Sequence, residues 1–298
     1  MAQPQIRDDI GGQYDVSRIR KDFPILSEEI HGKPLTFLDN GASAQKPRQV
    51  IDAVRAIYET EYANVHRGAY YLSEQATARY EGARDIVQRF LNASSRREIV
   101  FAKNVTEAIN LVAYSYARRV LEAGDEIIIT DMEHHSNIVP WQMIRDERGI
   151  VLKYVSCTDD GEFRIEDLAR LITPKTKLIS LTHVSNVMGT VVPIREVAKL
   201  AHDNGAKLLV DGAQAVMHMS VDVQYLDCDF YAVTGHKIYG PSGIGVLYGK
   251  AELLDAMPPF LGGGDMISTV TMEKSTWAAL PAKFEAGTPP IAQAVGLG

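Results

Sequence analysis

The chain has 298 residues, 46% of them hydrophobic and 23% charged, and its 31 basic and 38 acidic residues give a net charge of −7. This composition predicts a globular protein with a large core, and because neither charge is gathered into a long block, we expect no nucleic-acid partner. The start, MAQPQIRDDIGGQYD, lacks the apolar core of a signal peptide, and no later stretch is apolar for long enough to cross a bilayer, so we expect a cytoplasmic protein with no membrane partner.

Two parts of the chain predict units of a parallel sheet. Residues 98–102 form an apolar run of strand length, and in residues 105–116 apolar side chains recur on one helical face. Further on, LISLTHV (178–184) leads to a second helical pattern at 194–201 and then to the strand KLLV, which ends at Val210. The first unit is a strand, a loop and a helix, and the second is a βαβ crossover.

Units of this kind predict an α/β fold, a mostly parallel open sheet with helices on both faces. Such sheets bind ligands outside the carboxyl ends of their strands. Polar residues stand directly after five predicted strands, at Asn104–Thr106, Glu133–Asn137, Ser185–Asn186, Asp211–Gln214 and Thr234–Lys237. If these strands are neighbours, one crevice holds a carboxylate, a lysine, histidines and hydroxyls beside a helix N-terminus, which suits a phosphorylated cofactor.

Each of these residues has a simpler interpretation when it is taken alone. A lysine such as Lys237 is usually a solvated surface group, and an Asp-Gly pair such as residues 211–212 is usually a turn. The adjacent His134 and His135 point in different directions, and no HExxH motif is present, so we expect no metal. The joint occurrence of these groups at successive strand ends is what favours a functional site.

Five segments of the chain resemble one family of enzymes when they are taken together. They are DMEHHSNIVPWQ (131–142), THVSNVMGT (182–190), LLVDGAQAV (208–216), DFYAVTGHKIYGPSGIGVLYG (229–249) and FEAGTP (284–289). This set resembles the pyridoxal-phosphate enzymes of fold type I, and most closely the group II cysteine desulfurases of the Suf system. Selenocysteine lyases share the plan. The similarity extends from the N-terminal arm to the last residue.

The resemblance implies that pyridoxal 5'-phosphate (PLP) is the cofactor and that Lys237 binds it covalently. The cofactor acts as an electron sink, so a carboxylate must keep its pyridine nitrogen protonated, and Asp211 matches that residue. Gln214 resembles the partner of the phenolic oxygen. His134 resembles the histidine that stacks on the pyridine ring and moves protons, a task that suits imidazole because its pKa is near neutrality.

The resemblance also implies a phosphate site and a shared subunit interface. Thr106, Thr234 and His236 match residues that bind the phosphate. Val105 stands where close relatives can carry a second hydroxyl, so one contact of the family is expected to be missing. Thr288, in FEAGTP, resembles a residue that reaches the phosphate of the other subunit, which implies a homodimer.

Three further residues are expected on the substrate side. Asn186 is expected to face the substrate carboxylate, and His66 and Arg67, in ANVHRGAYYLS, match a family loop at the mouth of the site. The implied substrate is L-cysteine, or L-selenocysteine, with L-alanine as the product. The persulfide sulfur is then passed to an acceptor protein for iron-sulfur cluster assembly.

The resemblance divides the chain into three parts, and it assigns no residue of the chain to the nucleophilic attack on the substrate sulfur. Residues 1–30 are expected to be an N-terminal arm that belongs to a small domain, residues 31–290 the PLP-binding large domain, and residues 291–298 the start of a C-terminal segment that is otherwise absent. In the family, that segment carries the nucleophilic cysteine and the arginine that binds the substrate carboxylate. Cys157 and Cys228 do not match the nucleophile and are expected to be structural thiols.

Two alternatives of different class remain open on the sequence. The first is another fold type I enzyme, such as a selenocysteine lyase or an aminotransferase-like protein. The second is a non-catalytic module for PLP binding or assembly. An absorbance scan for the bound cofactor separates the interpretations that include PLP from a purely structural one.

Overall fold

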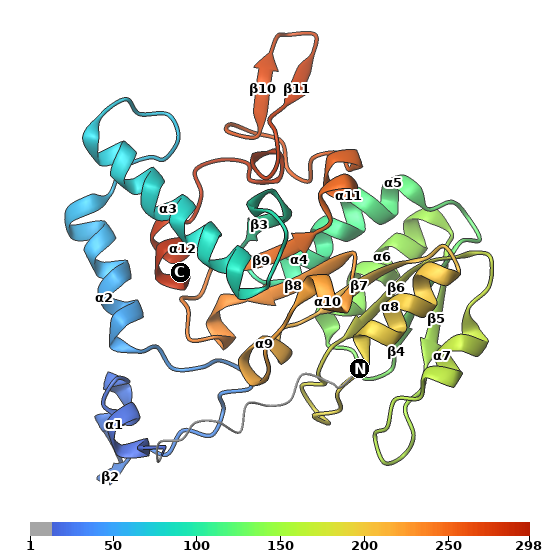
Figure 1. Cartoon of the computed structure of the whole chain (residues 1–298), viewed down its shortest axis with the longest axis horizontal. Coiled ribbons are helices and arrows are strands. Elements are labelled where there is room, and N and C mark those ends of the chain that lie inside the picture. The colour runs from blue at the N-terminus through green and yellow to red at the C-terminus, as the bar shows by residue number, and fades with distance from the viewer. Residues whose placement is uncertain (1–13) are drawn as a thin grey trace.

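A seven-stranded sheet runs through the centre of the molecule and is flanked by helices, in a computed structural model that describes residues 14–298 (Figure 1). Its strands lie in the order β3-β9-β8-β7-β6-β4-β5. Their bounds are β3 Ile99–Ala102, β4 Glu126–Thr130, β5 Val151–Val155, β6 Thr176–Thr182, β7 Lys207–Asp211, β8 Phe230–Thr234 and β9 Gly245–Gly249. Two separate hairpins are formed by β1 Glu29–Ile30 with β2 Lys33–Pro34, and by β10 Ile267–Val270 with β11 Ser275–Trp277.

The direction of the strands explains where a ligand can bind. Strand β9 runs antiparallel to both of its neighbours, β3 and β8, whereas the remaining pairs are parallel. Six strands therefore point the same way and end at one edge of the sheet. The predicted mostly parallel open sheet is confirmed, and so are the strands predicted at 98–102 and KLLV, which correspond to β3 and β7.

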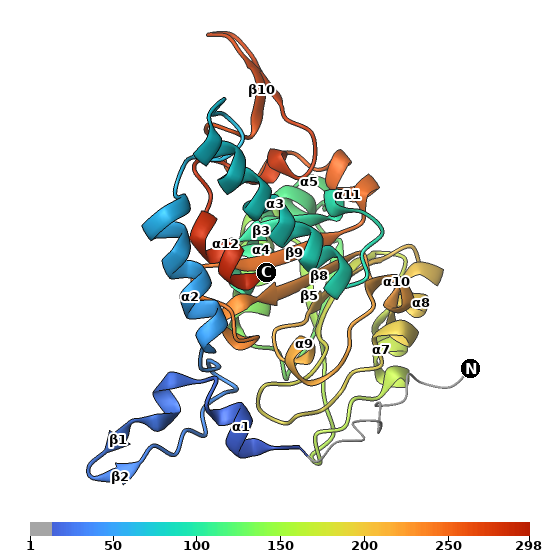
Figure 2. The ribbon, with the colours of Figure 1, turned by 60° about the vertical axis from the view of Figure 1, so that its left-hand side comes forward.

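Helices cover both faces of this sheet (Figure 2). Their bounds are α1 Val16–Arg20, α2 Arg48–Ala56, α3 Tyr71–Phe90, α4 Val105–Leu111, α5 Arg118–Val120, α6 Val139–Arg148, α7 Ile165–Leu171, α8 Ile194–Asp203, α9 Ala215–His218, α10 Val223–Leu226, α11 Ala251–Ala256 and α12 Ile291–Leu297. One core lies under α3, α8 and α12, and the other under α4, α6 and α11. Along β7, Leu208 and Val210 belong to the first core and Leu209 to the second, so the strand is buried on both faces.

The helix that follows β3 differs in detail from its prediction. It begins at Val105 as predicted, because the side chain of Asn104 accepts a hydrogen bond from the N–H of Glu107 at 2.9 Å and caps the first turn. The α-geometry ends at Leu111, and residues Val112–Ala117 form a π-helical turn before α5. Both parts contribute buried apolar side chains to the same core. The predicted apolar face is therefore correct, but the prediction of one continuous α-helix over residues 105–116 is wrong.

The two ends of the described chain pack differently. Helix α12 starts directly after Pro290 and packs against both α2 and α3 (Figure 2). Helix α1 and the β1–β2 hairpin lie apart from the central sheet, and the β10–β11 hairpin projects from the body (Figure 1).

Within residues 14–298, no helix is long and apolar enough to cross a membrane.

Candidate active site

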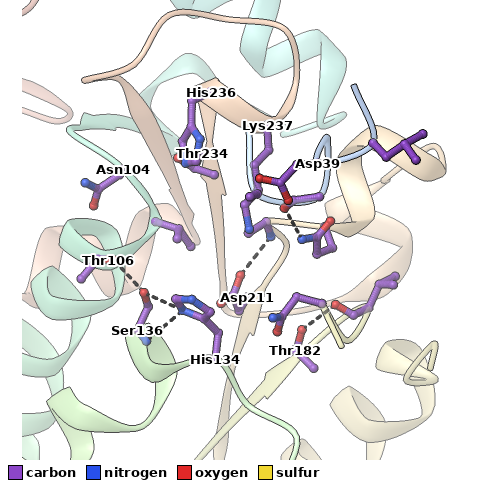
Figure 3. A pocket seen from close by; sticks show the side chains of 18 residues that line it. Asp39, Asn104, Thr106, His134, Ser136, Thr182, Asp211, Thr234, His236 and Lys237 are labelled. Carbon is purple, nitrogen blue, oxygen red and sulfur yellow. Dashed lines mark hydrogen bonds between the residues drawn. The ribbon is translucent and has the colours of Figure 1, made fainter. Parts of the chain in front are cut away.

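A cavity of about 550 Å³ opens at the carboxyl edge of the sheet (Figure 3). The segments that follow β3, β4, β6, β7 and β8 line it, together with residues 38–42 from the N-terminal part of the chain. Eight of the predicted site residues lie in its wall, namely Thr106, His134, Asn186, Asp211, Gln214, Thr234, His236 and Lys237. The five strand ends selected on the sequence therefore meet, as the order of the parallel strands requires.

Lys237 reaches the cavity from a tight turn, Gly235–Lys237, directly after β8. A Cβ at Gly235 would lie 2.8 Å from the side chain of Ile244 and 2.9 Å from its carbonyl oxygen, so only glycine fits this turn. Within residues 14–298 the lysine forms no hydrogen bond or ion pair, and burial lowers its pKa. A larger fraction of the amine is therefore neutral, which is the form that attacks a carbonyl carbon.

Asp211 ends β7 and is only 3% exposed. One carboxylate oxygen accepts the N–H of Ala213 at 2.9 Å, and within the described chain no cation lies within ion-pair distance. Burial raises the pKa of this carboxyl, although the charges of Lys237 and His134 oppose the rise. The carboxylate is thus desolvated and has acceptor capacity left for a protonated nitrogen inside the cavity.

His134 is fixed at the end of a short hydrogen-bonded chain (Figure 3). The N–H of Ser136 donates to Nδ1 of His134 at 3.2 Å, so Nδ1 is an acceptor and the ring proton is on Nε2. The hydroxyl of Ser136 bonds that of Thr106 at 2.6 Å. Burial lowers the pKa of His134, which favours the neutral imidazole.

The cavity also contains donors that suit a phosphate group. The hydroxyl of Thr234 is fully buried and has no hydrogen-bond partner among the described residues, and an unpaired buried hydroxyl costs free energy until a ligand bonds it. Thr106 lies in the first turn of α4, where backbone N–H groups have no partner within the helix. With Lys237 and Asp211 in the same cavity, these donors fit a phosphorylated aldehyde that carries a basic ring nitrogen, as in PLP.

One wall of the cavity, formed by residues 38–42, was not predicted from the sequence. The amide of Gln214 donates to the carbonyl of Gly41 at 2.8 Å, and the ammonium of Lys46 donates to the carbonyl of His236 at 3.0 Å. The stretch LTFLDNGA does show an apolar run that ends in a turn, which was the available signal. Ser136 was inside a predicted strand-end segment, but no role was assigned to it.

Three predicted residues do not line this cavity. His66, Arg67 and Thr288 are exposed in the single chain. His66 Nε2 lies 2.9 Å from Glu81, and Arg67 forms an ion pair with Asp265. Their roles at the mouth of the site and at a partner's phosphate stay predictions.

The segment FEAGTP is anchored by a buried ion pair. Glu285 receives two hydrogen bonds from Arg84, at 2.7 and 2.8 Å, and one from the N–H of Phe101 at 2.7 Å. Arg84 is 1% exposed and also donates to the carbonyl of Ile99 at 2.8 Å. The glutamate of the motif therefore fixes the segment that carries Thr288 against β3.

Neither cysteine lies at the cavity. Cys228 is fully buried, and burial raises its pKa well above the ordinary thiol value. Burial and the charge of Asp131 raise the pKa of Cys157 to about 11. Both thiols are therefore protonated near neutrality and are poor nucleophiles. Within residues 14–298, no group of three or more His, Cys, Asp or Glu side chains has the arrangement of a metal site.

Comparison with known proteins identifies the family. Residues 36–298 match the family model described as Aminotransferase class-V. The chain belongs to the aminotransferase class-V family. A cysteine desulfurase of Dickeya dadantii (strain 3937) is 55% identical over 286 residues, which cover 96% of this class-V chain and 69% of that protein. A probable cysteine desulfurase of Synechocystis sp. is 54% identical over 280 residues, which cover 94% and 67%. The similarity to cysteine desulfurases predicted from the motifs is confirmed.

Solved structures show the same fold as this class-V chain. The cysteine desulfurase CsdA of Escherichia coli aligns with a TM-score of 0.86 at 41% identity, covering 96% of this chain and 70% of that one. The apo cysteine desulfurase of Thermococcus onnurineus NA1 aligns with a TM-score of 0.90 at 39% identity and the same coverage. A C-DES mutant with glycine covalently linked to the PLP cofactor is 26% identical, with a TM-score of 0.80, covering 93% of this chain and 71% of that one. The chain spans about two thirds of the length of these relatives.

Proposed function

We propose that this chain is the cofactor-binding part of a PLP-dependent cysteine desulfurase, which releases sulfur from L-cysteine and leaves L-alanine for iron-sulfur cluster assembly. The observation that carries the proposal is the meeting of Lys237, Asp211 and the unpartnered hydroxyl of Thr234 in one cavity. The identity of 54–55% to cysteine desulfurases over nearly the whole chain selects this reaction among those of PLP enzymes. L-Selenocysteine is the alternative substrate.

Different residues of the cavity are assigned to different parts of the cofactor. When PLP is bound, Lys237 would hold it covalently through Nζ, Asp211 would keep a proton on its ring nitrogen, and the amide of Gln214, which donates to Gly41 in this structure, would bind its phenolic oxygen. Thr234, Thr106 and His236 bind the phosphate. When bound, PLP supplies an electron sink for the charge that develops on the substrate carbon.

Two residues of the chain move or stabilise protons and one orients the substrate. The amine of Lys237, whose pKa burial lowers, removes the proton from the α-carbon and later returns one. His134 is a neutral imidazole whose Nε2–H would be available to donate a proton to the substrate. Asn186, at the exposed end of the cavity, binds the substrate carboxylate.

Sulfur transfer needs a thiolate that attacks the sulfur of the substrate, so that an S–S bond forms as the C–S bond breaks and its electron pair stays on carbon. Cys157 and Cys228 lie outside the cavity, and their pKa values are raised. The accepting thiol is therefore neither of these two. In this proposal the arm at 1–30, of which residues 1–13 lie outside the described chain, and the segment from 291 onward belong to the small domain of the family.

The proposal includes a homodimer, in which Thr288 reaches the phosphate of the partner subunit, while His66 and Arg67 line the mouth of the site. Their exposure in the single chain and their absence from its own cavity support this assignment. An acceptor protein that takes the persulfide sulfur and a cytoplasmic location complete the proposal.

The decisive experiment locates the covalent adduct. The chain is incubated with PLP, reduced with borohydride, digested and analysed by mass spectrometry. A pyridoxyl group is expected on Lys237, and Lys237→Ala is expected to abolish it, whereas the exposed control Lys199→Ala on α8 keeps it. An adduct that persists on another lysine contradicts the assignment.

A further inference from the structure

A buried acid, Glu133, directly precedes His134 and joins three elements, two of which line the cavity at Thr182 and at His134. It is 7% exposed. Its Oε1 accepts hydrogen bonds from the hydroxyl of Thr130 at 2.6 Å and from the N–H of Thr182 at 3.0 Å. Its Oε2 accepts from the side-chain amide of Asn137 at 2.6 Å. One carboxylate therefore connects the ends of β4 and β6 with the turn that carries His134.

The orientation of the Asn137 amide is fixed by its other partners. The indole N–H of Trp141 donates to Oδ1 of Asn137 at 2.9 Å, and the hydroxyl of Ser180 donates to the same atom at 2.5 Å. An indole nitrogen can only donate, so the atom that faces it must be the oxygen. Asn137 is fully buried and must present its NH₂ group to Glu133. Both oxygens of Glu133 therefore face backbone or amide donors.

No cation balances this acid. Within residues 14–298, Glu133 takes part in no ion pair, and the titratable groups that interact with its charge are Asp211 at the end of β7 and Cys157 after β5. Burial raises the pKa of Glu133 to about 7. Among its three hydrogen-bond partners in the described chain, only the hydroxyl of Thr130 can also accept a hydrogen bond. A protonated Glu133 therefore keeps its bonds from Thr182 and Asn137 when the proton is on Oε1.

We propose that Glu133 is a positioning residue of this site, which holds the turn of His134 against the end of β6. The carbonyl of His134 accepts the N–H of Asn137 at 2.7 Å, so the bond from Asn137 to Glu133 fixes that turn at its far end. Within the turn, Ser136 links the imidazole of His134 to Thr106. The effect on the cofactor rests on the proposed function, but the effect on His134 does not.

Two variants distinguish positioning from general stability. Glu133→Gln places an NH₂ group against either the N–H of Thr182 or the NH₂ of Asn137, so both orientations set one donor against another. The exchanged pair, a double variant that combines Glu133→Gln with Asn137→Asp, restores every bond. The amide at position 133 then donates to the carboxylate at position 137, and that carboxylate still accepts from Trp141 and Ser180. The matched control is Glu166→Gln at an exposed position on α7.

The first measurement is the NMR signal of the His134 imidazole in the cofactor-free chain. We expect it to be displaced in Glu133→Gln, and to return to the wild-type position in the exchanged pair. The second measurement is PLP affinity with the absorbance spectrum of the bound cofactor. We expect about tenfold weaker binding, about 1.4 kcal/mol, and a shifted band in the single variant, with both restored in the pair.

The outcomes separate this inference from the proposed function. An unmoved His134 signal in Glu133→Gln, or no restoration in the exchanged pair, overturns the positioning role. If wild-type chain binds no PLP, the proposed function fails, while the His134 signal still tests Glu133. If the single variant does not fold, the exchanged pair decides, because the inference requires it to fold and to show the wild-type signal.

Discussion

The two ends of strands β7 and β8 both carry buried aspartates, but only one of these is surrounded by cations. At the amino end, Asp229 is fully buried and accepts a hydrogen bond from the N–H of Leu208 at 2.8 Å. His202 lies 2.7 Å from its carboxylate, and Lys207 and Lys250 approach to 3.4 and 3.7 Å. The chain itself supplies the countercharge at this end.

At the carboxyl end the arrangement is incomplete. Asp211 and Lys237 line one cavity, yet no ion pair within 4 Å joins them in the described chain, and the hydroxyl of Thr234 has no partner. Burial still raises the pKa of Asp211 and lowers that of Lys237, so their neighbours offset the desolvation cost only in part. The difference indicates that the amino end is built for stability and the carboxyl end for a ligand.

The largest expected effect is at the amino end. Asp229→Ala leaves Lys207 and Lys250 without their shared carboxylate and should lower the free energy of unfolding by about 3–5 kcal/mol, as when one partner of a buried ion pair is removed. Urea denaturation measures this loss. The exposed Asp203→Ala should change stability by less than about 1 kcal/mol. The PLP affinity of the folded Asp229→Ala protein should equal that of wild type. A large loss of affinity would contradict the conclusion that the amino end contributes to stability and not to ligand binding.

The next effect is on the pH dependence of stability. The pKa of Glu133 is about 7 in the folded chain against an ordinary value of 4.5, so between these values the folded chain holds a proton that the unfolded chain has released. Stability should therefore fall as pH rises from about 5 to 8, by up to about 3 kcal/mol. The difference between wild type and Glu133→Gln in urea denaturation across this range isolates the contribution. A difference that does not change with pH contradicts it.

Asp211→Asn should separate ligand binding from folding. The amide keeps the shape of the carboxylate, and because burial raises the pKa of Asp211, loss of the charge should leave the free energy of unfolding of the cofactor-free chain unchanged or slightly higher at a pH of about 8. PLP binding should weaken about 100-fold, or about 2.7 kcal/mol, because the ring nitrogen loses its counterion. Spectrophotometric titration and thermal unfolding measure the two quantities. Equal losses in both would make Asp211 a turn residue.

The smallest effect comes from Thr234→Val, which replaces the unpartnered hydroxyl with a methyl group. Removal of a buried, unsatisfied polar atom should stabilise the cofactor-free chain by about 1 kcal/mol. The same change should weaken PLP binding about tenfold, because a phosphate donor is lost. A variant that is both less stable and unchanged in affinity would show that the hydroxyl is bonded within the chain.

Local pattern was sufficient to predict the strand ends but not everything that meets there. Lys237 and Asp211 each follow an apolar run, so their place at the edge follows from the period and direction of the strands. Residues 38–42 come from a segment with no regular structure, and their contact with Gln214 depends on the path of the chain as a whole. The bonds of Glu133 were likewise unpredictable, because a charged residue in a polar loop is expected to be solvated until its burial is known.

The contact between the N-terminal segment and the lysine turn also sets an order of events during synthesis. Lys46 and His236, whose carbonyl it bonds, are 190 residues apart in the chain. The ribosome makes the N-terminal wall long before the turn that completes the cavity, and a contact of such separation is slow to close because its loop-closure entropy must be overcome first. The cavity can therefore be completed only after the turn at residues 235–237 has left the ribosome, and cofactor binding at this site must follow that step.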